Sequence, residues 1–224
     1  MLDLSTSKDR IVAAALRLAG ERAWADVTLT DIAKAADVNL AEVRREFNSK
    51  AEILAAFVRA VDDEVLARAS KRAAGQSARD ALFDVVMSRF DVMEPYRTAL
   101  NSIASTWTLD PALLRALAQS PAWMLRAADI KAEGFDGHVR ATGLGAVYAS
   151  VFRTWLKDDD PGLARTMAAL DRRLRRGVET LNAVDGFAKK VCDVAEGFRK
   201  ACARTSKPAE SKPEPEAPRP PISA

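Results

Sequence analysis

Residues that interrupt helices are scarce in the first 200 positions of this 224-residue chain. Six of the ten prolines lie after residue 207, and the ten glycines are thinly spread. Alanine, leucine, arginine, aspartate and glutamate dominate instead, and most of these side chains lose little freedom in a helix. Apolar residues make up 48% of the chain, which is enough to fill a core. The sequence therefore predicts an all-α protein.

Apolar residues recur at helical spacing from residue 8 to about residue 60. Within this segment, residues 29–47 read LTDIAKAADVNLAEVRREF, which predicts two short helices joined by a tight turn. Thr28 or Thr30 is placed to cap the first of them, and Asn48-Ser49 to cap a long helix that begins at Lys50. We therefore expect a compact helix-turn-helix head at residues 8–60.

The remainder divides into a helical body at residues 61–204 and a tail at 205–224. Asp-Pro and Ser-Pro pairs mark breaks in the body, because they suit a capping residue followed by proline at the first helical position. The expected helices cover residues 77–93, 96–107, 111–119, 121–129, 140–157, 161–183 and 186–204. The tail, TSKPAESKPEPEAPRPPISA, is Pro-rich and charged and has too little apolar surface to fold, so we expect it to be disordered.

The charge balance limits the kind of nucleic-acid contact that the chain can make. With 34 basic and 31 acidic side chains the formal charge is only +3. A protein that coats nucleic acid over its whole surface carries a much larger excess. Any contact with DNA must therefore be local.

Several features point to a soluble protein of a reducing compartment. No apolar run reaches the roughly 18–20 residues of a membrane span, and MLDLSTSKDR does not resemble a signal peptide. Cys192 and Cys202 are separated by about 15 Å along one predicted helix, too far to pair with each other. We expect a cytoplasmic protein.

The residue types that catalysis or metal binding would need are missing from the sequence. His138, the single histidine, has no Cys or His partner at metal-ligand spacing and is expected in a loop. The carboxylates of residues 158–160 precede Pro161, a pattern more typical of a helix cap than of a cation site. No nucleophile and base pair and no phosphate-binding glycine loop is recognisable. We expect no catalytic residues, no metal and no cofactor, and hence a protein that is not an enzyme.

The N-terminal segment reads IVAAALRLAGERAWADVTLTDIAKAADV, followed by a helix of nine residues and then FNSKAEIL. In its spacing this segment, from residue 8 to about 60, resembles the helix-turn-helix domain of the TetR family of transcriptional regulators. The resemblance implies a TetR-like homodimer with two small DNA-binding heads. It also implies a larger helical body that binds a small, often apolar, ligand.

The turn and the recognition helix depart from the family pattern, which usually has Gly, a small polar residue, Lys-Gly-Thr and an exposed aromatic. The matching positions hold Asp37, Asn39, Leu40, Ala41, Glu42 and Arg44. Asp37 can adopt a left-handed turn conformation at little cost. Carboxylates that face phosphates lose hydration without gaining a counter-charge, so Glu42 and Glu46 weaken DNA binding.

Two arginines partly offset these glutamates. Arg44 and Arg45 can clamp phosphates or read guanine, and Glu42 itself could accept a hydrogen bond from cytosine N4. We expect DNA binding that is weakened or unusual. The predicted contacts are Thr28, Thr30, Asn39, Leu40, Glu42, Arg44, Arg45 and Lys50.

A second stretch reads LGAVYASVFRTWLKDDDPGLARTMAALDRRLRR. Over residues 141–176 it is similar to the lipid-binding coenzyme Q biosynthesis accessory family, through Tyr148, Trp155, the turn at 158–161, Thr166, Leu170 and Arg173-Leu174. That family shares the TetR-like fold and does not read DNA. This resemblance implies the alternative function, a lipid- or isoprenoid-binding accessory protein with a vestigial head, although LTDIAKAADV is closer to the regulators.

Large apolar side chains are concentrated in the body, and helix bundles place ligand sites between facing helices. The predicted ligand pocket comprises Phe90, Trp107, Trp123, Met124, Tyr148, Phe152 and Trp155. A stripe of Met and aromatic residues at helical spacing is also what a plain core requires, so that alternative stays open.

Helix 161–183 carries an apolar seam at spacings typical of a coiled coil. The predicted dimer interface comprises Leu163, Met167, Leu170, Leu174 and Val178, which would pair with helix 140–157 as a four-helix bundle. Burial of the seam within one chain is the alternative. Residues 186–204 form a basic amphipathic helix that either packs on the body or lies on an anionic membrane surface.

Overall fold

Every α-helix of the N-terminal head begins at a polar side chain that accepts a hydrogen bond from the first turn. The side chains of Thr6, Thr28, Asn39 and Ser49 each accept from a backbone N–H three residues later. Such caps satisfy donors that have no partner within the helix. The computed structural model describes residues 4–106 and 110–177. In the head, each α-helix begins at the residue that follows one of these caps.

The described residues contain helices and no strand, which confirms the all-α prediction. The head consists of α1 (Ser7–Glu21), the 3-10 turn η1 (Trp24–Asp26), α2 (Leu29–Ala35), α3 (Leu40–Glu46) and the start of α4 (Lys50–Arg68). The body contains α5 (Ala78–Met93), η2 (Glu94–Tyr96), α6 (Arg97–Ser105), α7 (Pro111–Ala127) and α8 (Gly134–Trp155). Residues 164–177 form a further helix.

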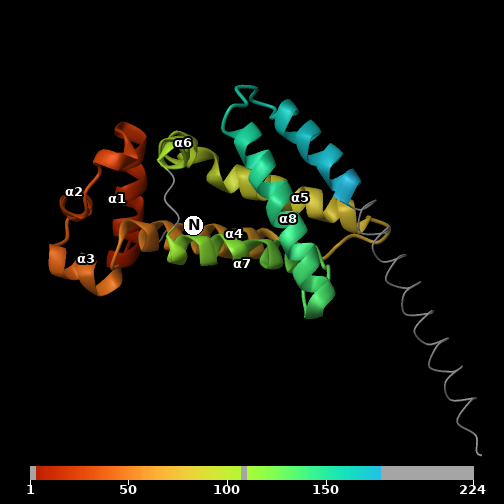
Figure 1. Ribbon diagram of the computed structural model, residues 1–224, viewed down its shortest axis with the longest axis horizontal. Coiled ribbons are helices and arrows are strands. Elements are labelled where there is room, and N and C mark those ends of the chain that lie inside the picture. The colour runs from red at the N-terminus through yellow and green to blue at the C-terminus, as the bar shows by residue number, and fades with distance from the viewer. Residues whose placement is uncertain (1–3, 107–109, 178–224) are drawn as a thin grey trace, which may run out of the picture. The chain divides into compact units, whose positions relative to one another are not determined.

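The head and the body are connected by α4, which runs through both (Figure 1). Its first turns pack on α1, and the rest of the helix packs along α7. The head also docks on α6, where the Trp24 amide donates to the Ser102 hydroxyl (3.0 Å) and this hydroxyl donates to the Arg22 carbonyl (3.3 Å). The domain boundary that we predicted at residue 60 thus falls inside a continuous helix.

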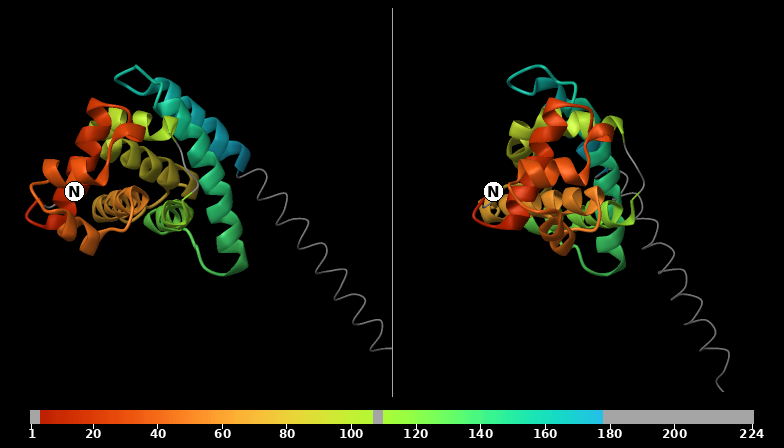
Figure 2. Two further views of the ribbon diagram at one scale, coloured as in Figure 1. Left: turned by 60° about the vertical axis from the view of Figure 1, so that its left-hand side comes forward. Right: turned by 90° about the vertical axis from the view of Figure 1, so that its left-hand side faces the viewer.

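In the body, α5 and α7 pack on α4, α8 packs on α7, and helix 164–177 returns alongside α8 (Figures 1 and 2). The core is continuous from Ile11 in the head to Leu170 in this last helix. Within residues 4–106 and 110–177, no helix combines the length and the hydropathy needed to cross a bilayer. The expected helix at 186–204 and the tail at 205–224 lie outside the described residues.

The prediction of separate helices at 111–119 and 121–129 is wrong, because α7 continues through Pro121. Ser120 and Pro121 are both buried, and the Ser120 hydroxyl donates to the Asp62 carboxylate on α4 (2.6 Å). A proline inside a helix removes one backbone hydrogen bond. Here the packing of α7 against α4 outweighs that loss, which local sequence rules do not take into account.

The prediction of a loop around His138 is also wrong, because α8 begins at Gly134. His138 Nδ1 lies 2.7 Å from the Gly134 carbonyl oxygen in the first turn. Gly134 has a φ of 71°, and a Cβ added at Gly137 would lie 2.2 Å from the Ala132 carbonyl carbon. The two glycines therefore permit a tight entry into the helix, where we had expected them to break it.

Candidate nucleic-acid interface and body sites

The turn between α2 and α3 is closed by Asp37, which adopts a left-handed conformation with a φ of 53°. The Val38 amide donates to the Ala33 carbonyl (3.1 Å), and the Asp37 amide donates to the Lys34 carbonyl (3.3 Å). This pairing ends many helices at a left-handed residue. Asp37 therefore preserves the helix-turn-helix geometry without the usual glycine.

The start of α3 is fixed by a reciprocal pair, Asn39 and Glu42. The Asn39 side chain accepts from the Glu42 amide (2.9 Å), and the Glu42 carboxylate accepts from the Asn39 amide (2.9 Å). This capping box satisfies two backbone donors at once. Both residues were predicted DNA contacts, and the structure gives each a role in holding α3.

Thr28 has the same capping role in α2. Its hydroxyl accepts from the Asp31 amide (3.1 Å) and donates to the Asp31 carboxylate (2.6 Å). These hydrogen bonds from Thr28, helped by the Arg22 guanidinium at 2.8 Å, lower the pKa of Asp31 to about 2. Thr30 lies exposed in the first turn of α2. The contacts predicted for Thr28 and Thr30 with DNA remain predictions.

The three predicted basic contacts lie in different environments. Arg44 donates to the Asn48 side chain (2.6 Å) at the end of α3, whereas Arg45 is exposed and has no polar partner among the described residues. Lys50 points into the head, where its ammonium donates to the Trp24 and Val27 carbonyls (2.7 and 2.6 Å) and lies 4.4 Å from the Trp24 ring centroid. Burial lowers the pKa of Lys50. The contact predicted for Lys50 with DNA remains a prediction.

Four of the predicted pocket residues form an aromatic cluster on α5 and α8. Phe90 stacks on Tyr148 and Trp155 with centroid distances of 5.5 and 5.4 Å, and Phe152 lies 5.5 Å from Trp155. Phe90 and Trp155 are fully buried, as is Met124 nearby in the core. Trp123 is 45% exposed under the Arg126 guanidinium, and Trp107 lies outside the described residues. These side chains do not line the two body cavities described below.

The polar centre of the body is a buried ion pair that sequence reasoning missed. Asp62 on α4 accepts from the Arg89 guanidinium on α5 and from the Ser120 hydroxyl on α7. Arg89 also donates to the Tyr148 hydroxyl on α8 (3.1 Å), and burial raises the pKa of that hydroxyl. Four helices therefore meet at one network. A signal was present in the sequence, because Asp62 interrupts the apolar face formed by Val58, Val61 and Val65.

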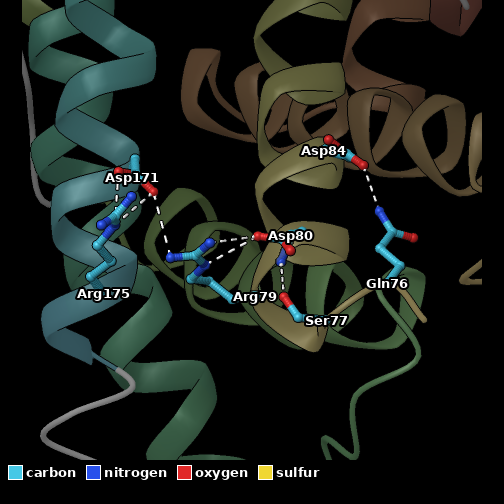
Figure 3. A network of polar contacts seen from close by, with 7 residues as sticks. All are labelled: Gln76, Ser77, Arg79, Asp80, Asp84, Asp171 and Arg175. Carbon is cyan, nitrogen blue, oxygen red and sulfur yellow. Dashed lines mark hydrogen bonds and ion pairs between the residues drawn. The ribbon is translucent and has the colours of Figure 1, made fainter.

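The larger cavity, of about 370 Å³, lies between the start of α5 and helix 164–177. Phe83, Met167 and Leu174 supply its apolar wall. Figure 3 shows the polar rim: Arg79 lies between Asp80 (2.8 Å) and Asp171 (3.8 Å), and Asp171 also pairs with Arg175. A second cavity of about 150 Å³ lies between α4, α5 and α7. Within the part of the chain that the structure describes, no cluster of carboxylate, His and Cys side chains is placed to hold a metal ion.

The predicted dimer seam is buried largely inside the single chain. Leu170 is 0% exposed, and Leu163 and Leu174 are also buried. Met167 is 38% exposed, and Val178 lies outside the described residues. Within this chain the three leucines pack into the core, as the alternative of burial within one chain expects. A partner contact for the seam stays a prediction.

Comparisons with protein families match two separate segments. Residues 11–57 match the model of the bacterial regulatory proteins of the tetR family, and residues 111–180 match the COQ9 model. Among curated proteins, none matches the chain significantly. The two family matches coincide with the head and with the segment from α7 to the last described helix.

Solved structures with a similar fold are TetR transcriptional regulators. One from Nitrosomonas europaea has a TM-score of 0.61 and 24% identity over 77% of this chain and 98% of its own. One from Rhodococcus sp. RHA1 has a TM-score of 0.61 and 21% identity over 78% and 97%. A tetR-family regulator from Streptomyces coelicolor covers 85% of this chain with a TM-score of 0.54 and 12% identity. The chain thus has the fold of the TetR transcriptional regulators, with a tetR-type helix-turn-helix at its N-terminus and a COQ9-like segment in its body.

Proposed function

We propose that the chain is a transcriptional regulator that binds operator DNA through α3 as a homodimer. The observation that carries this proposal is an intact helix-turn-helix whose second helix keeps Leu40, Ala41, Arg44 and Arg45 exposed. Such a helix enters the major groove, and two heads of a dimer meet half-sites one helical turn, or a multiple of it, apart. The exposed Phe135 and Val139 on α8 support pairing of two bodies.

A selection from random duplex DNA at low salt tests the proposal. We expect enrichment of a two-fold symmetric sequence, because a dimer presents two identical helices. The affinity for this sequence should fall steeply with salt, by a power of about 0.9 for each phosphate that the protein neutralises. Recovery of no enriched sequence would count against the proposal.

Replacing Arg45 with alanine should weaken binding to the selected duplex by about tenfold and reduce the salt exponent by about 1 per head. Arg45 is the exposed guanidinium on α3 that no described side chain engages, so its loss removes a DNA contact without disturbing the head. The matched control is Arg172→Ala, an exposed arginine on helix 164–177. Fluorescence anisotropy across a salt series measures both quantities, and equal behaviour of the two variants would contradict the role of Arg45.

The effector that we propose for the body is a small ligand with an apolar part and a polar end. The 370 Å³ cavity supports this choice, because its apolar wall of Phe83, Met167 and Leu174 is bordered by charged side chains. Ligands of this kind, screened by thermal shift, should raise the melting temperature of the wild type. Ala168→Trp should abolish the shift because it fills the cavity, whereas Ala164→Trp, exposed on the same helix, should retain it. A shift that survives Ala168→Trp would place the ligand elsewhere.

The COQ9 match over residues 111–180 favours a second candidate, a lipid-binding accessory protein with a vestigial head. Mass spectrometry of the purified protein would then find a bound lipid or isoprenoid. Anionic liposomes would also capture the protein, and deletion of residues 186–204, which lie outside the described residues, would abolish capture. Bound lipid together with a failed DNA selection would favour this candidate over the regulator.

A further inference from the structure

The exposed surface of α3 is divided into an apolar and basic arc and an acidic flank. Successive residues of an α-helix are rotated by about 100°, and the buried Val43 marks the inward direction. Ala41 and Arg45 then face directly outward. Leu40 and Arg44 lie on one flank of them, and Glu42 and Glu46 lie on the other. The carboxylates therefore occupy one side of α3, away from the centre of its exposed face.

Glu42 is also committed to the fold. Its carboxylate accepts from the Asn39 amide, and the Asn39 side chain accepts in return from the Glu42 amide, both at 2.9 Å. This capping box holds the first turn of α3 and keeps the Glu42 carboxylate on the acidic flank of the helix. Direct readout of bases at the start of α3 therefore falls to Leu40 and Ala41, the exposed residues beside Glu42.

Both of these exposed neighbours of Glu42 are apolar. Leu40, the first residue of α3, is 52% exposed, and Ala41 beside it is exposed as well. In helix-turn-helix proteins the N-terminal residues of the second helix contact the base edges. In the major groove the four bases present hydrogen-bonding groups and a single apolar group, the 5-methyl of thymine. That methyl is the base feature that Leu40 complements chemically.

We infer that Leu40, supported by Ala41, reads thymine in the operator through its 5-methyl group. The inference rests on the proposed DNA binding and names the residue that sets its specificity at one position of each half-site. Leu40 gains apolar contact area only where thymine is present, whereas Arg44 and Arg45 supply phosphate or guanine contacts beside it.

The test uses the duplex enriched from the random library, with each thymine replaced in turn by deoxyuridine. This change removes only the methyl group and leaves base pairing intact. At one position per half-site, affinity of the wild type should fall about fourfold for each methyl lost. Leu40→Ala should bind the thymine duplex more weakly and lose the difference between thymine and deoxyuridine. Leu40 is exposed, so circular dichroism should show an unchanged fold.

The control variant is Glu42→Gln, which should keep the full sensitivity to deoxyuridine. If the wild type binds the enriched duplex and no deoxyuridine substitution weakens it, the readout by Leu40 is wrong while the DNA-binding proposal stands. If Leu40→Ala loses as much affinity on deoxyuridine substitution as the wild type does, the readout by Leu40 is likewise wrong, while the DNA-binding proposal stands. If no duplex is enriched at all, the proposed function fails first and the readout fails with it.

Discussion

Replacing Asp62 with alanine is expected to lower the free energy of unfolding by about 3–5 kcal/mol. The substitution leaves the Arg89 guanidinium buried without its carboxylate, and the Ser120 hydroxyl loses its acceptor. A buried charge without a partner is among the most costly defects that a core can contain. Urea unfolding followed by circular dichroism measures the loss. Asp63→Ala is the matched control, because Asp63 is the next residue on α4 and is exposed.

The double variant Asp62→Ala, Arg89→Met separates the charge from the packing. Removing both partners takes away the unpaired cation, so the double variant should be more stable than Asp62→Ala alone. Ser120→Ala should cost only about 1 kcal/mol, because Asp62 keeps its guanidinium partner. A loss for Asp62→Ala as small as that of the Asp63 control would show that the pair does not hold the four helices together.

The second large effect is expected from Leu170→Glu. Leu170 is fully buried within the chain, so the substitution removes a core side chain and places a carboxylate among apolar neighbours. The loss should exceed the roughly 2–5 kcal/mol that a buried Leu→Ala change costs. Met167→Glu, on the exposed side of the same helix, should change the stability of the fold by less than about 1 kcal/mol.

Light scattering combined with urea unfolding distinguishes the two roles of Leu170, a core residue of one chain or a residue of the dimer interface predicted from the sequence. A seam residue would give a well-folded monomer when it is replaced by glutamate. A core residue gives a protein that is destabilised at every concentration. If Leu170→Glu is a stable, folded monomer, Leu170 belongs to the dimer interface and the expected loss of stability is wrong.

Local chemistry explains what could be predicted from the sequence. The helix-turn-helix was recognisable because its determinants are short-range: Thr28 and Asn39 cap the two helices, and an aspartate suits the left-handed position between them. Arg45 and Leu40, which the sequence predicts as DNA contacts, are exposed on α3, and their contact with DNA stays a prediction. Their surroundings depend on residues close to them along the chain.

The features that the sequence did not reveal depend on contacts between distant segments. Pro121 remains inside α7 because α7 packs along α4, and Leu170 is buried because helix 164–177 packs into the core of its own chain. Asp62 and Arg89 are 27 residues apart, and no periodicity connects them. A coiled-coil spacing also could not tell an intramolecular partner from an intermolecular one, since both bury the same face.

Because α4 is one continuous helix, a tilt at its body end is transmitted to the head. Lys50 is hydrogen-bonded to the head near one end, and Asp62, twelve residues further on and about 18 Å along the axis, is bonded to Arg89 on α5 and Ser120 on α7. A tilt of about 10° around Asp62 would displace the Lys50 end by about 3 Å, which is close to the roughly 3.4 Å spacing of bases along one strand. A change in the body too small to alter any helix would thus shift α3 by nearly one base pair, and in a dimer the two shifts would add.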